Sequence, residues 1–363
     1  MSSKVHLPSL NGIRAIAVLM VLVSHVDQFS AMLGISNLSV GGLGLGWKGV
    51  VLFFTLSGFL ITYLLELEKQ QFNKIHFAKF YIRRILRIWP IYYLIILITI
   101  IGGFLFSELQ VFNKTHVSSL AYFLLFLGNY EYVFGLGIIT LTPLWSVAVE
   151  EQFYIFWPWL IAKTGNVIFR VLLFLVVFLV VKLLLQKFDT HWYKVLYISS
   201  FSSMAIGALM ALLYLQKSKI LTIVFNTYFQ IAIIILFILF HFTTIFHFYT
   251  FINREIFSIV DALLILNLAL NTKTIVSLEH PIINKIGVVS YGIYIYHMLV
   301  IFLVSKLFTL LNLHFLNNNL LYAIATLLVI TFISILVSIF SYNYIEKKFL
   351  SLKSKFALVK SFS

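Results

Sequence analysis

The sequence predicts an all-α, polytopic integral membrane protein with about ten transmembrane helices. Of its 363 residues, 61% are hydrophobic and only 10% are charged, which excludes an ordinary soluble domain. Repeated apolar runs are long enough to cross a bilayer as helices. The chain has no cysteine, so disulfides, thiol nucleophiles and thiolate metal sites are excluded.

The excess of positive charge reflects membrane orientation and does not indicate nucleic-acid binding. The net charge is +14, but most lysines and arginines lie in short segments between the apolar runs. Basic residues gather in the cytoplasmic loops of membrane proteins, and that rule accounts for the pattern. The expected partner is therefore the lipid bilayer, and no nucleic acid is expected.

Ten apolar segments are candidate spans. An eleventh segment, Ala121–Phe134, is apolar over only about fourteen residues, which is short for a transmembrane helix. The ten candidates cover residues 10–30, 50–65, 88–106, 144–162, 167–185, 195–215, 220–246, 256–270, 288–311 and 320–344.

Loop charges decide between ten and eleven spans. With ten spans and a cytoplasmic N-terminus, 18 basic residues lie in inner loops and 5 in outer loops, whereas an eleventh span changes these counts to 10 and 13. The positive-inside rule favours ten. It predicts a plasma-membrane protein with both termini in the cytoplasm and with 121–134 as a short outer re-entrant or interfacial helix. Residues 1–363 are predicted to form one domain that ends in a short basic cytoplasmic tail, 345–363.

The first span carries an arginine near one end and a histidine near the other. Arg14 and His25 are eleven residues apart, which places them on one helical face and about 16 Å apart along its axis. In this topology Arg14 lies in the inner half of the membrane and His25 in the outer half. Snorkelling of Arg14 and neutral packing of His25 would explain each residue alone. Their alignment favours a functional polar stripe, because an intramembrane arginine has to face a bundle interior or a wet cavity.

Two adjacent glutamates lie inside the predicted span 144–162. Glu150 and Glu151 point about 100° apart on a helix, so different partners are expected for them. Glu150 lies at a depth similar to that of His25. A glutamate that is protonated or paired with Arg14 would have a structural role. Otherwise, a carboxylate inside the membrane is a candidate catalytic group, acting directly or by orienting a histidine.

Three arginines stand at the predicted inner rim, shortly before Pro90. Arg84 and Arg87 are three residues apart, so their side chains can point the same way, and Arg83 adjoins them. Planar guanidinium groups suit phosphates and pyrophosphates. A topology signal or a contact with anionic lipid is the alternative.

A second histidine lies in the predicted span 288–311. Ser290, Tyr294 and His297 share one helical face, and His297 is expected near the middle of the membrane. The alternative is a histidine that is simply hydrogen-bonded within the core. No histidines and carboxylates have metal-ligand spacing on one helix, so no metal is predicted.

Six stretches together resemble the membrane-bound acyltransferase 3 family, whose members O-acylate surface sugars, antibiotics and other acceptors. They include an Arg-x10-His pair, Arg14 and His25, and an Arg-x-x-Arg pair, Arg84 and Arg87. In chain order the stretches are LPSLNGIRAIAVLMVLVSH, GVVLFFTLSGFLI, FYIRRILRIWPIYY, LWSVAVEEQFYIFWP, SYGIYIYH and YIEKKF.

The sequence also departs from the family pattern. Asn11 and Ala15 replace a commoner Asp and Gly, and Val51 stands where many members carry an acidic residue. The soluble SGNH esterase-like domain fused to some members has no counterpart in this sequence.

The resemblance implies an O-acyltransferase that uses an acyl-CoA donor, often acetyl-CoA, on the cytoplasmic side. The acceptor would be a hydroxyl of a surface carbohydrate or a lipid-linked glycan on the far side. We expect the inner-rim arginines to hold the nucleotide of the donor, whose pantetheine arm would pass Arg14. We expect His25 to be the general base, with its tautomer set by Glu150. Direct acylation of His25 is the alternative chemistry.

A transporter for polysaccharide or lipid-linked glycan is the alternative function. A polar stripe through ten spans also suits a permeation path. The sequence has no recognisable inverted repeat and no matching pair of Gly- or Pro-broken spans, so the enzyme is favoured.

Overall fold

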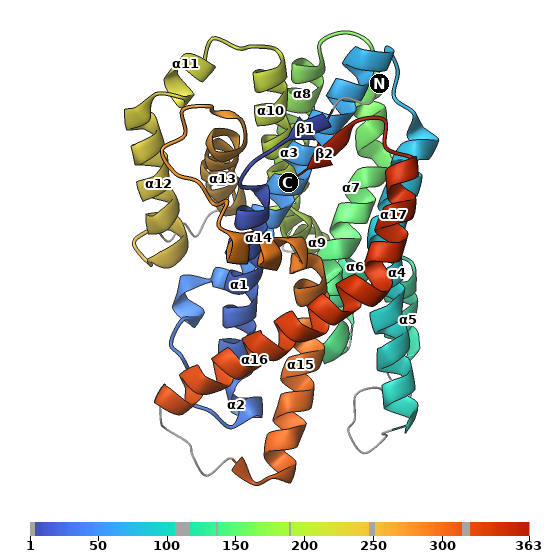
Figure 1. Ribbon diagram of the computed structural model, residues 1–363, viewed down its shortest axis with the longest axis vertical. Helices are drawn as coiled ribbons and strands as arrows, with labels where there is room; N and C mark the ends of the chain where they lie inside the picture. Colours follow the sequence, from blue (N-terminus) through green and yellow to red (C-terminus); the bar gives the residue numbers. More distant parts are fainter. Residues whose placement is uncertain are drawn as a thin grey trace.

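Helices make up almost all of the structure, which confirms the all-α prediction (Figure 1). The structure is a computed structural model that describes residues 4–105, 117–135, 137–188, 190–246, 251–313 and 320–362. In these residues the β-structure is one pair of short strands, β1 and β2. In chain order the strands and α-helices are β1 (Lys4–His6), α1 (Leu10–Gln28), α2 (Ser30–Leu33), α3 (Leu45–Phe72), α4 (Phe77–Leu105), α5 (Val117–Leu124), α6 (Gly128–Phe134), α7 (Leu144–Ala162), α8 (Val167–Gln186), α9 (His191–Ser199), α10 (Phe201–Leu215), α11 (Leu221–Val224), α12 (Thr227–Phe242), α13 (Asn253–Leu270), α14 (Pro281–Val288), α15 (Ser290–Leu310), α16 (Leu320–Ser341), α17 (Lys347–Lys355) and β2 (Lys360–Phe362).

Seven helical segments of the described chain are long and apolar enough to cross a membrane. They contain α1, α3, α4, α8, α9 with α10, α15 and α16. The other three predicted spans fall on α7, α12 and α13, of which α12 has only 16 residues. Each predicted span thus has a helix. A polytopic membrane protein is confirmed, while the number of crossings stays a prediction.

Helix α3 lies at the centre of the bundle and contacts α1, α7, α10 and α13. Its crossing with α10 is very close, because a glycine of each helix faces the backbone of the other. A Cβ added to Gly58 would lie 1.9 Å from the carbonyl oxygen of Met204, and one added to Gly207 would lie 2.0 Å from that of Thr55. Small residues allow such close packing between membrane helices.

Helices α3 and α4 extend well beyond the predicted spans 50–65 and 88–106. The helices are longer than the spans because hydropathy marks only the apolar part of a helix. Glutamate, lysine, glutamine and arginine are good helix formers and continue the helix past that part. The basic stretch between the two spans is therefore largely helical, and its arginines stand on α4, which also contains Pro90.

The short segment 121–134 is not one helix. It is divided between α5 and α6, and the chain turns at Phe126, whose φ is +54°. Helices of eight and seven residues are too short to cross a bilayer. Helix α6 packs against α7 and α9. Its predicted position on the outer side stays a prediction.

The predicted tail, 345–363, is folded against the bundle. Helix α16 passes through a π-helix, Tyr342–Glu346, into α17, which packs along α4. Strand β2 then pairs in parallel with β1, so that Lys360 aligns with Lys4 (Figure 1). The last helix is thereby held beside the helix that carries the predicted phosphate-binding arginines.

Candidate active site

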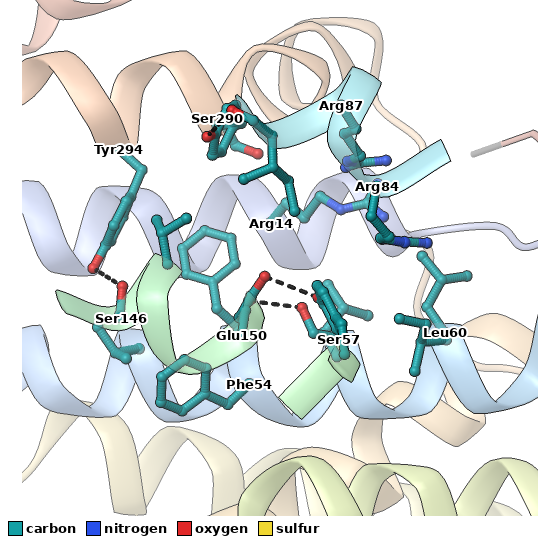
Figure 2. Close-up of a pocket in the computed structure, with 18 residues that line it drawn as sticks. Arg14, Phe54, Ser57, Leu60, Arg84, Arg87, Ser146, Glu150, Ser290 and Tyr294 are labelled. Atoms are coloured by element: carbon teal, nitrogen blue, oxygen red, sulfur yellow. Dashed lines mark hydrogen bonds between the residues drawn. The ribbon is translucent and has the colours of Figure 1, made fainter. Parts of the chain in front are cut away.

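Three adjoining cavities contain most of the predicted site residues. Their volumes are about 850, 880 and 1230 Å³, and Leu60 and Arg87 line all three. The first cavity, drawn in Figure 2, extends to Glu150 on α7 and Tyr294 on α15. The other two are lined by α17, which contributes Lys353 to both.

Arg14, Arg84 and Arg87 converge at one end of the first cavity (Figure 2). Arg14 Nη1 donates a hydrogen bond of 2.8 Å to Asn11 Oδ1. Arg84 lies 5.3 Å from the ring of Tyr154, and its Nε is buried without a hydrogen-bond partner. Among the described residues, neither Arg84 nor Arg87 forms an ion pair. A cation half-buried without a carboxylate is suited to bind an anion, because isolated charges are costly to bury.

Arg83 differs from its two neighbours because its guanidinium is engaged in protein contacts. Its Nη2 lies 3.2 Å from Glu68 Oε2, and its Nη1 donates to the carbonyl oxygen of Phe356 at 2.9 Å. The first contact joins α4 to α3, and the second joins α4 to the end of α17. Arg83 lines one of the cavities, but its contacts connect helices to one another.

The two adjacent glutamates have different partners, as their angular offset predicts. Glu150 faces the cavity and accepts hydrogen bonds from Ser57 at 2.8 Å and from Tyr154 at 2.9 Å (Figure 2). Glu151 accepts from the indole of Trp89 at 3.2 Å, and its other oxygen is buried without a partner. Glu150 is therefore the carboxylate that belongs to the cavity wall.

His25 is paired with a histidine and not with the expected Glu150. The Nδ1 atom of His25 lies 2.9 Å from Nε2 of His297, with ring centroids 5.0 Å apart. His297 is only 1% exposed, and its Nδ1 lies 2.7 Å from the carbonyl oxygen of Tyr294. The ten-span topology predicts similar depths for His25 and Glu150, but packing of α15 against α1 decides which side chain His25 meets.

These contacts determine the proton positions of the neutral histidine pair. A carbonyl oxygen can only accept, so His297 Nδ1 carries its proton and donates to Tyr294. His297 Nε2 is then an acceptor, and His25 Nδ1 has to donate to it. The remaining nitrogen of His25, Nε2, carries the lone pair. The pair thus presents one basic nitrogen, oriented by a buried histidine.

Tyr294 stands between the cavity and the histidine pair. It lines the cavity, its ring centroid is 5.8 Å from that of His297, and its hydroxyl lies 2.6 Å from Ser146 Oγ (Figure 2). Ser290, the third residue of the predicted face, also lines the cavity, one turn before Tyr294. The predicted face of α15 is therefore divided, with two residues on the cavity and His297 against His25.

Two residues of the site are not distinguished by any pattern in the sequence. Ser57 belongs to an apolar run and becomes relevant only because α3 packs on α7 beside Glu150. Lys353 is one of several tail lysines, and no motif distinguishes it. Within the described ranges, no group of three or more histidines and carboxylates could hold a metal ion.

Comparison with known proteins identifies relatives of the chain. Residues 7–339 match the acyltransferase domain that defines the acyltransferase 3 family. The chain is 32% identical over 164 residues to the peptidoglycan O-acetyltransferase OatA of Listeria monocytogenes, and 36% identical over 163 residues to the putative peptidoglycan O-acetyltransferase YrhL of Bacillus subtilis. A putative O-acetyltransferase of Staphylococcus aureus is 31% identical over 160 residues.

These alignments are partial. They cover 43%, 42% and 42% of this chain, and 24%, 23% and 24% of the respective relatives. The matched part of the chain thus spans about a quarter of the length of these curated relatives. No solved structure matches the chain.

Proposed function

Since the chain belongs to the acyltransferase 3 family, we propose that it is a membrane O-acetyltransferase that transfers an acetyl group from cytoplasmic acetyl-CoA to a hydroxyl of a cell-envelope carbohydrate. One observation carries the proposal. A single cavity has Arg84 and Arg87, which form no ion pair among the described residues, at one end and adjoins, through Tyr294, an oriented histidine pair.

The acceptor class rests on the relatives. Two of them are named as peptidoglycan O-acetyltransferases, one of these putatively. A polymeric sugar or a lipid-linked glycan outside the plasma membrane would meet the outer half of the bundle, where the ten-span topology puts His25. Both chain termini would then lie in the cytoplasm, on the donor side.

The donor would bind at the arginine end. Arg84 and Arg87 are available for the phosphates of CoA, because no carboxylate of the described chain pairs with them. The pantetheine arm would run along the cavity past Arg14 toward Glu150 and Tyr294, which line the same space. Arg14 donates a hydrogen bond to Asn11 and lines the cavity between the arginine end and Glu150.

The chemical step follows from the proton positions. His25 Nε2 accepts the proton of the acceptor hydroxyl while the hydroxyl oxygen attacks the thioester carbonyl carbon. The carbon–sulfur bond breaks, and the CoA sulfur leaves with the proton that His25 has taken. Meanwhile the His25 imidazolium donates through Nδ1 to His297, which spreads the positive charge. Transfer of the acetyl group to His25 Nε2 as a relay is the alternative path.

Acetyl transfer by purified protein in lipid nanodiscs tests the function. With acetyl-CoA and a soluble peptidoglycan fragment, free CoA and acetylated fragment should appear together. His25→Ala should lower the rate by a factor of about 10²–10⁴, the usual contribution of a general base. The affinity for CoA should be unchanged, because Arg14 lies about 16 Å along α1 from His25, and Arg84 and Arg87 line the cavity with Arg14. Mass spectrometry of the protein during turnover distinguishes the two paths, because only the relay path produces an acetylated His25.

His191→Ala is the matched control, since His191 is exposed at the start of α9 and should leave the rate unchanged. A folded His25→Ala protein with full activity would overturn the mechanism. Wild-type protein that consumes no thioester with any sugar acceptor would overturn the enzyme and favour a glycan transporter.

A further inference from the structure

We propose that the C-terminal helix α17 completes the donor site and that Lys353 binds a phosphate group of the donor. This inference rests on the proposed function, because it takes acetyl-CoA as the donor. The family match covers residues 7–339, and Lys353 lies outside both this match and the YIEKKF stretch.

Lys353 is the lysine of α17 that faces the bundle. The helix carries four lysines, and Lys347, Lys348 and Lys355 are exposed, whereas Lys353 is half-buried. Lysine is rarely buried without a partner, because its ammonium is strongly hydrated. A bound anion would stabilise the charged Lys353 side chain in this position.

The surroundings of Lys353 are rich in cations. It lines one cavity with Arg83, Arg84 and Arg87, and it lines the neighbouring cavity with Arg87 and Arg14. Within the described part of the chain, Lys353 forms no ion pair. Lys353 and Arg87 thus stand together at the junction of both cavities.

The carboxylates near these cavities do not balance the cations. Glu68 lines one cavity but is paired with Arg83 and His76. Glu346 lines the other and accepts a hydrogen bond from Ser341 at 3.4 Å. Like charges this close repel unless an anion lies between them. A CoA molecule brings a pyrophosphate and a ribose phosphate, so it can supply one anionic group to each of the two cavities.

Helix α17 is held in place by contacts that do not use Lys353. Arg83 donates to the carbonyl oxygen of Phe356, directly after the helix. Strand β2 then pairs with β1, just before α1 and Arg14. Lys353 can therefore be changed without removing the connections that position its helix.

Binding measured with and without the nucleotide tests the inference. Wild-type, Lys353→Ala and Lys355→Ala proteins are placed in nanodiscs of phosphatidylcholine, which has no net charge. Their dissociation constants are measured for acetyl-CoA and for S-acetylpantetheine, which carries no phosphate. Lys355 is exposed on the same helix and controls for the loss of one positive charge.

Lys353→Ala should weaken acetyl-CoA binding by about 10- to 100-fold, the usual effect of a lost charge-assisted contact. Binding of S-acetylpantetheine should not change, and Lys355→Ala should bind both donors as the wild type does. The acetyl ester of dephospho-CoA, which lacks the ribose phosphate, identifies the phosphate concerned. If Lys353 binds the ribose phosphate, Lys353→Ala and wild type should bind this donor equally. If Lys353 binds the pyrophosphate, Lys353→Ala should still bind it more weakly than the wild type.

Equal binding of acetyl-CoA by wild type and Lys353→Ala would overturn the inference and leave the proposed function standing. Absence of acetyl-CoA binding by the wild type itself would instead overturn the proposed donor. Repeating the measurement with phosphatidylglycerol added separates a lipid phosphate from the donor phosphate. Lys353 would be assigned to lipid by two results together. Phosphatidylglycerol would compete with acetyl-CoA in the wild type, and Lys353→Ala would lose binding of this lipid but keep a normal affinity for acetyl-CoA.

Discussion

His297 is paired with no carboxylate of the described residues, yet its hydrogen bonds decide which nitrogen of His25 is basic. The carbonyl oxygen of Tyr294 fixes the proton of His297, and His297 in turn fixes the proton of His25. A carboxylate in that place would add charge stabilisation, whereas a neutral imidazole mainly orients. In the proposed mechanism, His297 is a positioning residue that acts through His25.

Replacement of His297 should therefore lower turnover without affecting donor binding. We expect His297→Ala to reduce kcat by about 10- to 100-fold, since the charged form of His25 loses one hydrogen bond. Adding His297→Ala to His25→Ala should cost nothing more, because the two residues act as a unit. Acetyl transfer and CoA affinity of both single variants and the double variant would measure this. Additive losses in the double variant would mean that His297 has a separate, structural effect.

The arginine end makes a distinct prediction at the residue scale. Arg84→Ala and Arg87→Ala should each weaken acetyl-CoA binding by about 10- to 100-fold, because each removes a charge-assisted contact. Lysine at either position should restore only part of the affinity, since it cannot form two parallel hydrogen bonds. Calorimetric titration with acetyl-CoA would measure both effects.

Arg83→Ala is the informative comparison for that pair. Arg83 is engaged by Glu68 and Phe356, so its loss should lower thermal stability more than either neighbouring variant does. Normal acetyl-CoA affinity in both Arg84→Ala and Arg87→Ala would assign those residues to topology or lipid contact.

At the scale of elements, the site depends on helices that are longer than their apolar parts. Helix α4 carries its arginines and its membrane-buried residues on one continuous element, with Pro90 inside it. Helix α3 brings Ser57 to Glu150 and is fixed by its close crossing with α10. Movement of α3 relative to α10 would therefore disturb the cavity wall.

Glycine-to-alanine substitution tests that crossing. Gly58→Ala should destabilise the protein by about 1–3 kcal/mol, because its new Cβ would overlap the Met204 carbonyl and force the helices apart. Gly102→Ala is the matched control, since a Cβ at Gly102 in α4 meets nothing within 4 Å, and alanine should there be neutral or slightly stabilising. Thermal unfolding followed in detergent would compare them. Equal melting temperatures for Gly58→Ala and Gly102→Ala would show that α3 and α10 can move apart at little cost in stability.

At the scale of the whole molecule, orientation decides which substrate meets which end of the cavity. Strand β1 pairs with β2, so the first described residues lie beside the segment that follows α17, which packs along the arginine-bearing α4. With the termini in the cytoplasm, that side faces cytoplasmic acetyl-CoA, and His25 lies toward the outer surface. In the opposite orientation the arginines would lie at the outer leaflet. They could not then bind cytoplasmic acetyl-CoA, which would contradict the proposed donor.

Reporter fusions would test this orientation. A reporter inserted after Gly137 should be active outside, whereas reporters after Thr164 and after Ser363 should be active inside, because the positive-inside rule puts the basic loops in the cytoplasm. A C-terminal reporter that reads outside would contradict the ten-span topology. It would also reverse the depth assigned to every later residue.

The sequence by itself determined the all-α membrane class, the position of a helix at each predicted span and the family. These follow from local properties, since hydropathy, helical periodicity and short motifs need no knowledge of packing. The same properties placed Arg14 with His25 on one face and predicted different partners for Glu150 and Glu151.

Only the tertiary structure decided which side chains meet. His25 contacts His297 rather than Glu150 because α15 packs beside α1, and a depth along the membrane does not specify an angle around a helix. Lys353 became part of the site because the C-terminal segment folds back along α4. Contacts between residues far apart in the chain depend on how helices pack, which no local pattern contains.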